Sequence, residues 1–267
     1  MTDVPNQPMS VPSRLGATAR YEDGELIIDT VPQPQTLRHG VLRGSVLSFA
    51  LDAVAGITLD QDPDAWALTT DMTLRMRPVP APRCVSARTR VLREGRRSAT
   101  CKVDMTAPDG SLVATGAVGF ARVARKPDDP PKPIVTPEQA PMVLRDLGTL
   151  SLPLRAEAGI EVVDAAEGVV EVEVTPRLLN PAGTLQGAMV ALLAEAAAED
   201  LVEARFGEPA VVVDLDLRYL GKVGSGRVRT RCRLLGDTAD SPVEVELVEV
   251  SSGDVTTLVH ARAVRPA

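Results

Sequence analysis

Aromatic side chains are scarce in this chain of 267 residues, because only 2% of the sequence is Phe, Trp or Tyr. The core must therefore be built from Val, Leu, Ala and Met. Only two histidines are present, His39 and His260, so a metal site rich in histidine is excluded. The three cysteines lie far apart and form no Cys-x-x-Cys pair. Such cysteine usage indicates a reducing compartment, and we expect the protein to be cytoplasmic.

The sequence also lacks the features of membrane and nucleic-acid-binding proteins. No apolar run approaches the roughly 18 residues that span a bilayer. The N-terminal stretch MTDVPNQPMSVPSR is polar and contains proline, which predicts a flexible leader and not a signal peptide. The net charge of −7 and the pI of about 5.0 argue against nucleic acid or a membrane as partner. With 44% hydrophobic and 24% charged residues, the composition is typical of a soluble globular protein.

What the sequence does contain is a repeat with one constant offset, the distance along the chain from Gly44 to Gly187. These glycines occupy the same place in two similar segments, HGVLRGSVLSFALDA and AGTLQGAMVALLAEA. The same offset pairs Asp52 with Glu195, and it pairs Asp-Met-Thr-Leu-Arg at 71–75 with Asp-Leu-Asp-Leu-Arg at 214–218. One register held over this distance indicates an internal duplication.

Both copies show the same pattern of expected elements. A strand ending at a proline is followed by a long helix and then by strands with period-two alternation. The first strands are expected at 25–31 and 169–175, the helices at 41–59 and 184–206, and the alternating strands at 69–77 and 211–220. This is an α+β layout in which a sheet must wrap around the helix. Two such sheets side by side would form a pseudo-dimer within one chain.

A proline-rich segment separates the copies. Residues 126–141 hold so many prolines that helix and central strand are both disfavoured, which predicts an extended, semi-stiff linker. We therefore expect an N-terminal domain at residues 1–125, the linker at 126–141, and a C-terminal domain at 142–267.

The segment Asn180-Pro-Ala-Gly-Thr-Leu-Gln-Gly-Ala188 leads into the second helix. Glycines at a helix start leave N–H groups uncovered, and the helix dipole favours negative charge there, as an oxyanion hole requires. The alternative is a turn that only lets the helix begin. Eight residues after each helix glycine stands an acid, Asp52 or Glu195, in an apolar stripe. Such an acid is used in chemistry, or else it faces solvent or neutralises an arginine.

Together these features resemble the hot-dog thioesterases of the phenylacetate-pathway (PaaI-like) type, to which thioesterase superfamily member 2 and 4-hydroxybenzoyl-CoA thioesterase are similar. The shared motif is Asn-x-x-Gly-x-Leu-x-Gly at a helix start, with an acid eight residues after the last glycine. The resemblance covers residues 24–123 and 168–264, and it is more specific for the fold than for hydrolysis. It implies two tandem hot-dog domains that form an intrachain pseudo-dimer.

In that family the helix glycine and a preceding Asn or Gln polarise the thioester carbonyl. An acid from the partner subunit acts as general base or nucleophile, and a Ser or Thr supports the attacking water. The second copy here keeps Asn180 and Gly187. It departs from the pattern at Gln186, where histidine is usual, at Ala188, where a second glycine is usual, and at Val212, where the hydroxyl should be.

The first copy departs from the family pattern at the residues that would polarise the carbonyl. It has Leu37 in place of the asparagine and Arg43 in place of the histidine, yet it keeps the acid, Asp52, and the hydroxyl, Thr69. Because sites in the family straddle the interface, the resemblance implies one complete catalytic set, formed by Asp52, Thr69, Asn180 and Gly187. A second, reduced site would combine Glu195 with Gly44.

Three further residues are candidates for binding the substrate: Gln186, Arg77 and His39. Arg77 belongs to a run of arginines between residues 75 and 90 that could hold the phosphates of coenzyme A. The run also fits a solvated face of the sheet. His39 precedes the first helix, where it fits a pocket wall or a solvated turn.

We therefore expect an acyl-CoA thioesterase that hydrolyses its substrate to a free acid and CoA, with a non-catalytic protein that binds acyl-CoA as the alternative. A hot-dog hydratase is disfavoured because its Gly-Asp-x-Asn-Pro-x-His stretch is absent. No cofactor and no metal are expected, since coenzyme A enters only as part of the substrate. The expected partner is a second copy of the chain in a homodimer. The sequence does not reveal the acyl group.

Overall fold

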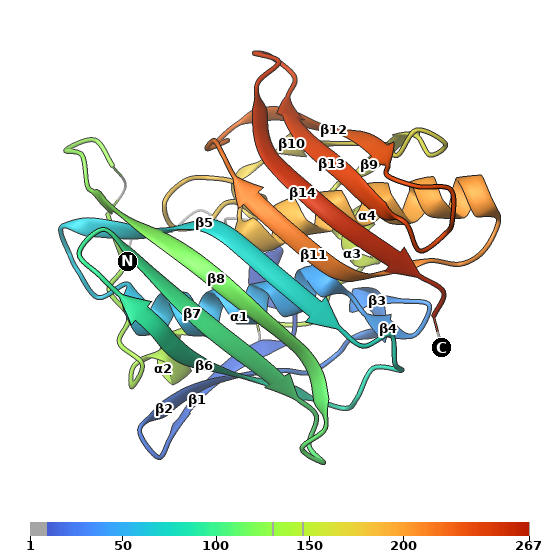
Figure 1. Cartoon of the computed structure of the whole chain (residues 1–267). Coiled ribbons are helices and arrows are strands. Elements are labelled where there is room, and N and C mark those ends of the chain that lie inside the picture. Colours follow the sequence, from blue (N-terminus) through green and yellow to red (C-terminus); the bar gives the residue numbers. More distant parts are fainter. Residues whose placement is uncertain (1–9, 130, 146, 267) are drawn as a thin grey trace.

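The computed structural model describes residues 10–129, 131–145 and 147–266. Within them, one antiparallel sheet of twelve strands curves around two long helices, α1 (Gly44–Leu59) and α4 (Gly187–Phe206), which lie behind the sheet in Figure 1. The strand order is β1-β2-β6-β7-β8-β5-β11-β14-β13-β12-β10-β9. Strands β5 and β11 are therefore the central pair, and the strands follow in an equivalent order on either side of it.

The twelve strands of the sheet are four to thirteen residues long. The sheet strands are β1 (Ala17–Glu22), β2 (Glu25–Thr30), β5 (Ala65–Met76), β6 (Val85–Glu94), β7 (Ser98–Thr106), β8 (Leu112–Ala124), β9 (Glu161–Asp164), β10 (Val169–Val174), β11 (Val211–Tyr219), β12 (Gly226–Leu234), β13 (Pro242–Glu249) and β14 (Val255–Val264). A separate hairpin of β3 (Leu37–Arg38) and β4 (Val41–Leu42) precedes α1, and two short helices, α2 (Ala140–Val143) and α3 (Leu154–Glu157), follow the first half of the sheet.

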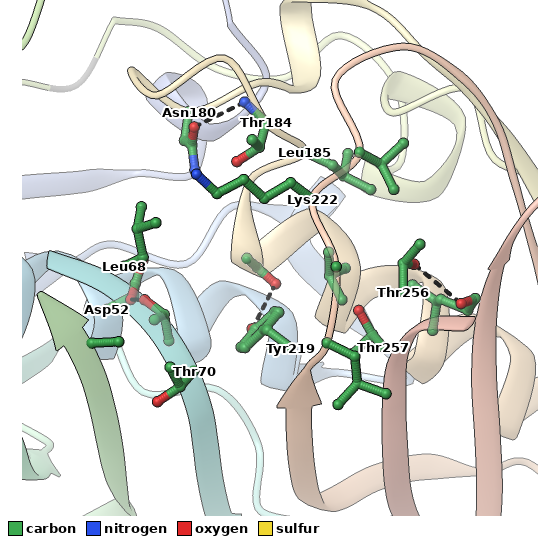
Figure 2. Close-up of a pocket in the computed structure, with 18 of the residues that line it drawn as sticks. Asp52, Leu68, Thr70, Asn180, Thr184, Leu185, Tyr219, Lys222, Thr256 and Thr257 are labelled. Atoms are coloured by element: carbon green, nitrogen blue, oxygen red, sulfur yellow. Dashed lines mark hydrogen bonds between the residues drawn. The ribbon is translucent and has the colours of Figure 1, made fainter. Parts of the chain in front are cut away.

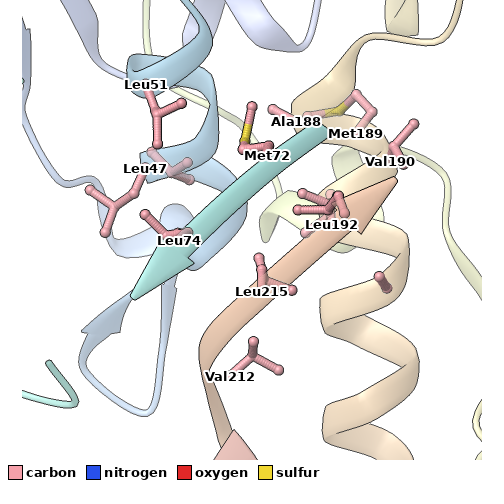
Figure 3. Packing of buried hydrophobic residues seen from close by; sticks show 14 of the residues in the cluster. Leu47, Leu51, Met72, Leu74, Ala188, Met189, Val190, Leu192, Val212 and Leu215 are labelled. Atoms are coloured by element: carbon pink, nitrogen blue, oxygen red, sulfur yellow. The ribbon is translucent and has the colours of Figure 1, made fainter. Parts of the chain in front are cut away.

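The core fills the space between the two helices and the concave face of the sheet. In Figure 3, Leu47 and Leu51 of α1 and Leu192 of α4 point toward Met72 of β5 and Leu215 of β11, and all five are at most 1% exposed. Helix α4 is buried along most of its length, which fits its run of alanines and leucines on every side. Because alanine side chains are short, α4 can pack closely against α1 and the sheet.

Five residue pairs join the two halves of the sheet at its centre. Residues 71–75 of β5 pair with residues 214–218 of β11, in antiparallel register. On the concave side of this junction Leu74 and Leu217 are buried. On the convex side Asp214 accepts a hydrogen bond from Nε of Arg262 at 2.6 Å and lies 3.7 Å from Nε of Arg75. The junction thus has an apolar face toward the helices and a charged face toward solvent.

The expected elements lie close to those observed, within a few residues at each end. The first helix begins at Gly44 and not at residue 41, and β5 begins four residues earlier than expected. Of the predicted leader, residues 1–9 lie outside the described residues, and the prediction is wrong for the part that follows. Val11 is fully buried and its N–H donates to the carbonyl of Arg177 at 2.9 Å. No helix in the described ranges is both long and apolar enough to cross a membrane.

The proline-rich segment between the two halves contacts the first half of the sheet through Lys132. The side chain of Lys132 is 1% exposed and donates to Oδ1 of Asp60 at 2.7 Å and to the carbonyls of Asp62 and Ala65 at 2.6 Å. Its ammonium also lies 5.5 Å from the ring centre of Trp66, at the start of β5. These contacts hold the segment at Lys132 against the end of the sheet where β5 begins.

Candidate active site

A pocket opens where the two central strands separate. The pairing of β5 with β11 stops at Asp71 and Arg218, so the residues before Asp71 and after Arg218 diverge. The gap holds a pocket of about 250 Å³ that is lined by residues of both halves of the chain. Figure 2 shows it between β5, the end of β11 and the start of α4. Because the two halves meet here, groups from separate helices reach one cavity.

The walls of the pocket are mostly apolar. Leu68 of β5, Ala121 of β8, Val190 of α4 and Leu247 of β13 contribute to its lining. At the mouth Leu220 is 63% exposed, so an apolar side chain there faces solvent. The volume is just below the usual range of about 300–1,000 Å³ for small-molecule pockets, which suits part of a ligand better than the whole of a large one.

One wall carries a carboxyl group held by a hydroxyl. Asp52 lies on α1, two turns after the helix begins, and Thr69 lies on β5. The Thr69 hydroxyl donates to Oδ1 of Asp52 at 2.7 Å. Burial raises the pKa of Asp52, and the hydrogen bond from Thr69 offsets part of that rise. A carboxylate in a largely apolar pocket, with its pKa moved toward neutrality, is suited to accept a proton.

The facing wall presents hydrogen-bond donors at the start of α4. Gly187 is the first residue of this helix, and its N–H has no partner among the described residues. Before the helix, Oδ1 of Asn180 accepts from the N–H of Thr184 at 3.1 Å, which fixes the amide. The amide nitrogen of Asn180 makes no hydrogen bond within the described chain and remains available as a donor. Asp52, Thr69, Asn180 and Gly187 thus all line one pocket.

Several polar residues of the pocket were not anticipated from the sequence, among them Tyr219 and Lys222. Tyr219 is the last residue of β11, and its hydroxyl donates to the carbonyl of Gly187 at 3.3 Å. Lys222 follows in the loop after β11, and in Figure 2 its side chain extends toward Asn180. The only sequence signal was that Tyr219 ends an alternating strand on its apolar face. The end at which this strand separates from its neighbour depends on how β5 and β11 pair, and the amino-acid composition does not determine that.

The repeat offset pairs this pocket with a second place at the start of α1, where the N–H of Gly44 is already bound. We call this place the closed cleft and the pocket beside Gly187 the open cleft. The N–H of Gly44 donates to Oε1 of Glu195 at 2.7 Å, and the Ser45 hydroxyl donates to Oε2 at 2.6 Å. Glu195 is 1% exposed, and Nη1 of Arg43 lies 3.4 Å from its Oε2. Where the open cleft has Thr69 this one has Val212, which is 1% exposed. The acid here binds the first N–H of the helix directly, so that N–H is already occupied.

Further charged side chains lie along α4 next to the closed cleft. Glu199 is fully buried and accepts from Nη1 of Arg43 at 3.0 Å. Burial raises the pKa of Glu199 to about 7, with the nearby Glu195 charge adding to the rise and Arg43 opposing it. One turn further, Glu203 accepts from Nη2 of Arg38 at 2.5 Å and lies 2.9 Å from Nε2 of His39. These residues form a continuous ionic cluster between the hairpin before α1 and α4.

None of the three candidates for binding the substrate lines the pocket within the described residues. Oε1 of Gln186 accepts from the N–H of Ala188 at 2.6 Å, so the side chain caps α4. His39 contacts Glu203 in the closed cleft. Arg77 follows the opposite end of β5, eight residues from Thr69, which is about 26 Å along a strand.

No protein-family model matches the chain, and no curated protein sequence does so. Solved structures do. The chain is similar to the tesB protein of Mycobacterium avium subs paratuberculosis, with 14% identity, a TM-score of 0.64, and 96% of this chain and 98% of that chain covered. It is similar to an acyl-ACP thioesterase from Bacteroides thetaiotaomicron, with 12% identity, a TM-score of 0.61, and 89% and 97% covered.

A third similar structure is a protein of unknown function with hot-dog fold from Alicyclobacillus acidocaldarius. Its identity is 14%, its TM-score is 0.58, and the match covers 96% of this chain and 98% of that chain. At such identities the likeness concerns the backbone and not the chemistry. Together with the curved antiparallel sheet around its long helices, it shows that the chain has the hot-dog fold.

Proposed function

We propose that this chain is an acyl-CoA thioesterase with one working site. The observation that carries the proposal is one pocket lined both by Gly187, whose helix N–H has no partner among the described residues, and by Asp52, whose carboxyl group is partly buried. A donor for a developing oxyanion and a base for a water are the two groups that thioester hydrolysis needs. The apolar walls suit an acyl chain.

The reaction follows from these positions. Asp52 takes a proton from a water, and the water oxygen bonds to the thioester carbonyl carbon. The carbonyl oxygen gains a negative charge, which the Gly187 N–H and the Asn180 amide stabilise. The Thr69 hydroxyl donates to Asp52, so its lone pairs remain free to accept the second hydrogen of the water. When the carbon–sulfur bond breaks, the thiolate takes the proton from Asp52.

The organisation of the chain supports a single site of this kind. We propose two hot-dog domains in tandem, at residues 1–125 and 142–267, related by the constant repeat offset and by the equivalent strand order on either side of the sheet. The first domain supplies the base and the second supplies the donors. In the reverse combination the Gly44 N–H is already bound by Glu195, so this N–H is not available to a carbonyl oxygen.

Coenzyme A is the proposed carrier of the acyl group, and no other cofactor is required. Lys222 lines the pocket and is exposed to solvent, so its ammonium can meet an anionic group of the carrier outside the pocket. One solved structure with this fold is named an acyl-ACP thioesterase, so both carriers are compared in the test. The full-length chain is given a series of acyl-CoA thioesters and the matching acyl-ACP thioesters, and thiol release is measured.

Faster hydrolysis of the CoA series, abolished in an Asp52→Asn variant, supports the proposal. Hydrolysis of the ACP series alone would contradict the carrier, and no hydrolysis of either would contradict the activity.

The second candidate function is binding of acyl-CoA without hydrolysis. It is favoured by Gln186, which takes the place of a usual histidine and uses its side chain to cap α4. Under this alternative, calorimetry detects tight binding of intact acyl-CoA while thiol release stays at the background rate.

A further inference from the structure

Tyr219 stands between the two groups that the proposed reaction uses. It ends β11, one residue beyond the last pair that joins β11 to β5. With no partner strand beside it on that side, its side chain reaches into the gap and lines the pocket together with Asp52 and Gly187. Figure 2 shows the hydroxyl directed at the first turn of α4.

The hydroxyl touches the residue that presents the free N–H. It donates to the carbonyl of Gly187 at 3.3 Å, which is long for a hydrogen bond between oxygens. A Cβ atom placed on Gly187 would lie 3.1 Å from Oη and 3.6 Å from Cζ of Tyr219. The ring end therefore covers the Cα of Gly187, and the glycine leaves just enough room for it.

The proton of this hydroxyl is retained at every pH at which proteins normally work. Burial raises the pKa of Tyr219, and the negative charge of Asp52 raises it further. The group is thus a neutral donor beside a carboxylate. Because a hydroxyl hydrogen rotates freely about the C–O bond, it can leave the weak bond to the Gly187 carbonyl for a stronger acceptor.

The closed cleft has no such donor. The repeat offset places Met76 at the position of Tyr219, and its Sδ lies 3.4 Å from the point where a Cβ of Gly44 would stand. The two side chains cover their glycines in the same way, but only one carries a hydroxyl. The hydroxyl occurs where the helix N–H is free, and the thioether occurs where the N–H is already bound by Glu195.

We propose that the Tyr219 hydroxyl donates a hydrogen bond to the thioester carbonyl oxygen and shares that oxygen with the Gly187 N–H as negative charge develops. This inference rests on the proposed thioesterase activity and adds a catalytic residue to it. Since the bond strengthens as charge grows on the oxygen, Tyr219 stabilises the transition state more than the bound substrate.

The test is Tyr219→Phe in the full-length chain, which removes one oxygen atom and keeps the ring. Its control is Tyr21→Phe, because Tyr21 is the other of the two tyrosines and lies at the surface on β1. With the best acyl-CoA substrate of the wild type, we expect kcat to fall about 100-fold in Tyr219→Phe, by analogy with loss of one oxyanion donor. KM should change little, and Tyr21→Phe should match the wild type.

A second readout separates catalysis from structure. An acyl-CoA thioether has no carbonyl oxygen at the reacting position, whereas a trifluoromethyl ketone analogue of acyl-CoA forms a charged tetrahedral adduct. Tyr219→Phe should weaken the ketone about 100-fold and leave the thioether unchanged. Equal weakening of both, or an unchanged kcat, would overturn the inference.

If the phenylalanine variant does not fold, Tyr219→Met is measured in the same way, since it copies the residue of the closed cleft. Failure of the inference differs from failure of the proposed function. In the first case the wild type hydrolyses thioesters and Tyr219→Phe does so equally well, and in the second case the wild type does not hydrolyse them.

Discussion

The two clefts of this molecule start from the same parts and end in opposite states. Each has a helix that begins at a glycine, and each has an acid that lies eight residues inside the other helix. In the closed cleft the longer acid, Glu195, reaches the Gly44 N–H. In the open one the shorter acid, Asp52, accepts from Thr69, and the Gly187 N–H has no partner in the described part of the chain. The two acids differ by one methylene group, and each accepts from a different hydroxyl, that of Ser45 for Glu195 and that of Thr69 for Asp52.

The largest effect should come from exchanging the two acids for their amides. Asp52→Asn removes the proposed base, so kcat/KM should fall roughly 100- to 10,000-fold. Glu195→Gln removes a carboxylate that is already bound to the Gly44 N–H, and kcat/KM should stay near the wild-type value. Steady-state kinetics on both folded variants decides this. A greater loss in Glu195→Gln would reverse the roles of the two clefts.

The ionic cluster of the closed cleft should matter for stability. Arg43→Met leaves Glu195 and Glu199 buried without their nearest cation, and the free energy of unfolding at pH 8 should fall by about 3–5 kcal/mol. Arg231→Met is the matched control, because its exposed pair with Glu246 contributes about 0–1 kcal/mol. Urea denaturation measures both. Similar small losses would show that the cluster does not hold the cleft closed.

Adding one methyl group to each glycine sharpens the comparison further. In Gly187→Ala the new Cβ lies 3.1 Å from the Tyr219 hydroxyl, which must shift by a few tenths of an ångström. We expect kcat to fall about tenfold, because small misplacements in a catalytic site are costly. In Gly44→Ala the nearest atoms are 3.4 Å away, an ordinary contact, so activity should be unchanged. A loss in Gly44→Ala comparable to that in Gly187→Ala would point to distortion of the fold.

The smallest effect is a shift in pH dependence. Because burial raises the pKa of Asp52, the acid limb of kcat/KM should lie above the range of an ordinary aspartate, with activity rising as Asp52 ionises. Thr69→Val removes the bond that lowers this pKa, so the limb should move further upward. If the acid limb of kcat/KM has the same midpoint in Thr69→Val as in the wild type, Thr69 does not influence the pKa of Asp52.

The contribution of Asp52 to stability falls with rising pH, whereas its contribution to activity rises. A folded pKa above the unfolded one means that Asp52 favours folding below its unfolded pKa and that this contribution is lost as pH rises through the folded pKa. At neutral pH and above, Asp52→Asn should therefore unfold at a temperature no lower than the wild type, while remaining inactive. Thermal scans between pH 5 and 8 measure the difference.

The sequence contained enough to expect the long helices, since a glycine start and an unbroken run of small and apolar residues are local features. It was also enough, through a family resemblance, to select Asp52, Thr69, Asn180 and Gly187, which all line one pocket. Their roles stay predictions. The spacing could also have placed Arg77 away from the site, because it lies eight residues along a strand from Thr69.

What the sequence could not provide depends on contacts between the halves. Tyr219 belongs to the pocket only because β5 and β11 separate at Arg218, and no local pattern marks where strands from distant segments part. The expectation that Gln186 binds the substrate stays a prediction, and the structure shows in addition that its side chain accepts from the N–H of Ala188 and caps α4. The closure of the second cleft likewise needs the geometry of Glu195 and Arg43 across the two helices.

The junction of β5 and β11 also bears on how the protein is made. Strand β11 leaves the ribosome about 145 residues after β5, which at roughly 5–20 residues per second is a delay of about 7–29 s. Until β11 arrives, β5 is an open sheet edge with an apolar face, and such edges pair readily with other chains. Newly made first halves must therefore be kept apart during this interval, and the appearance of activity in a translation reaction would report directly on when the second half has docked.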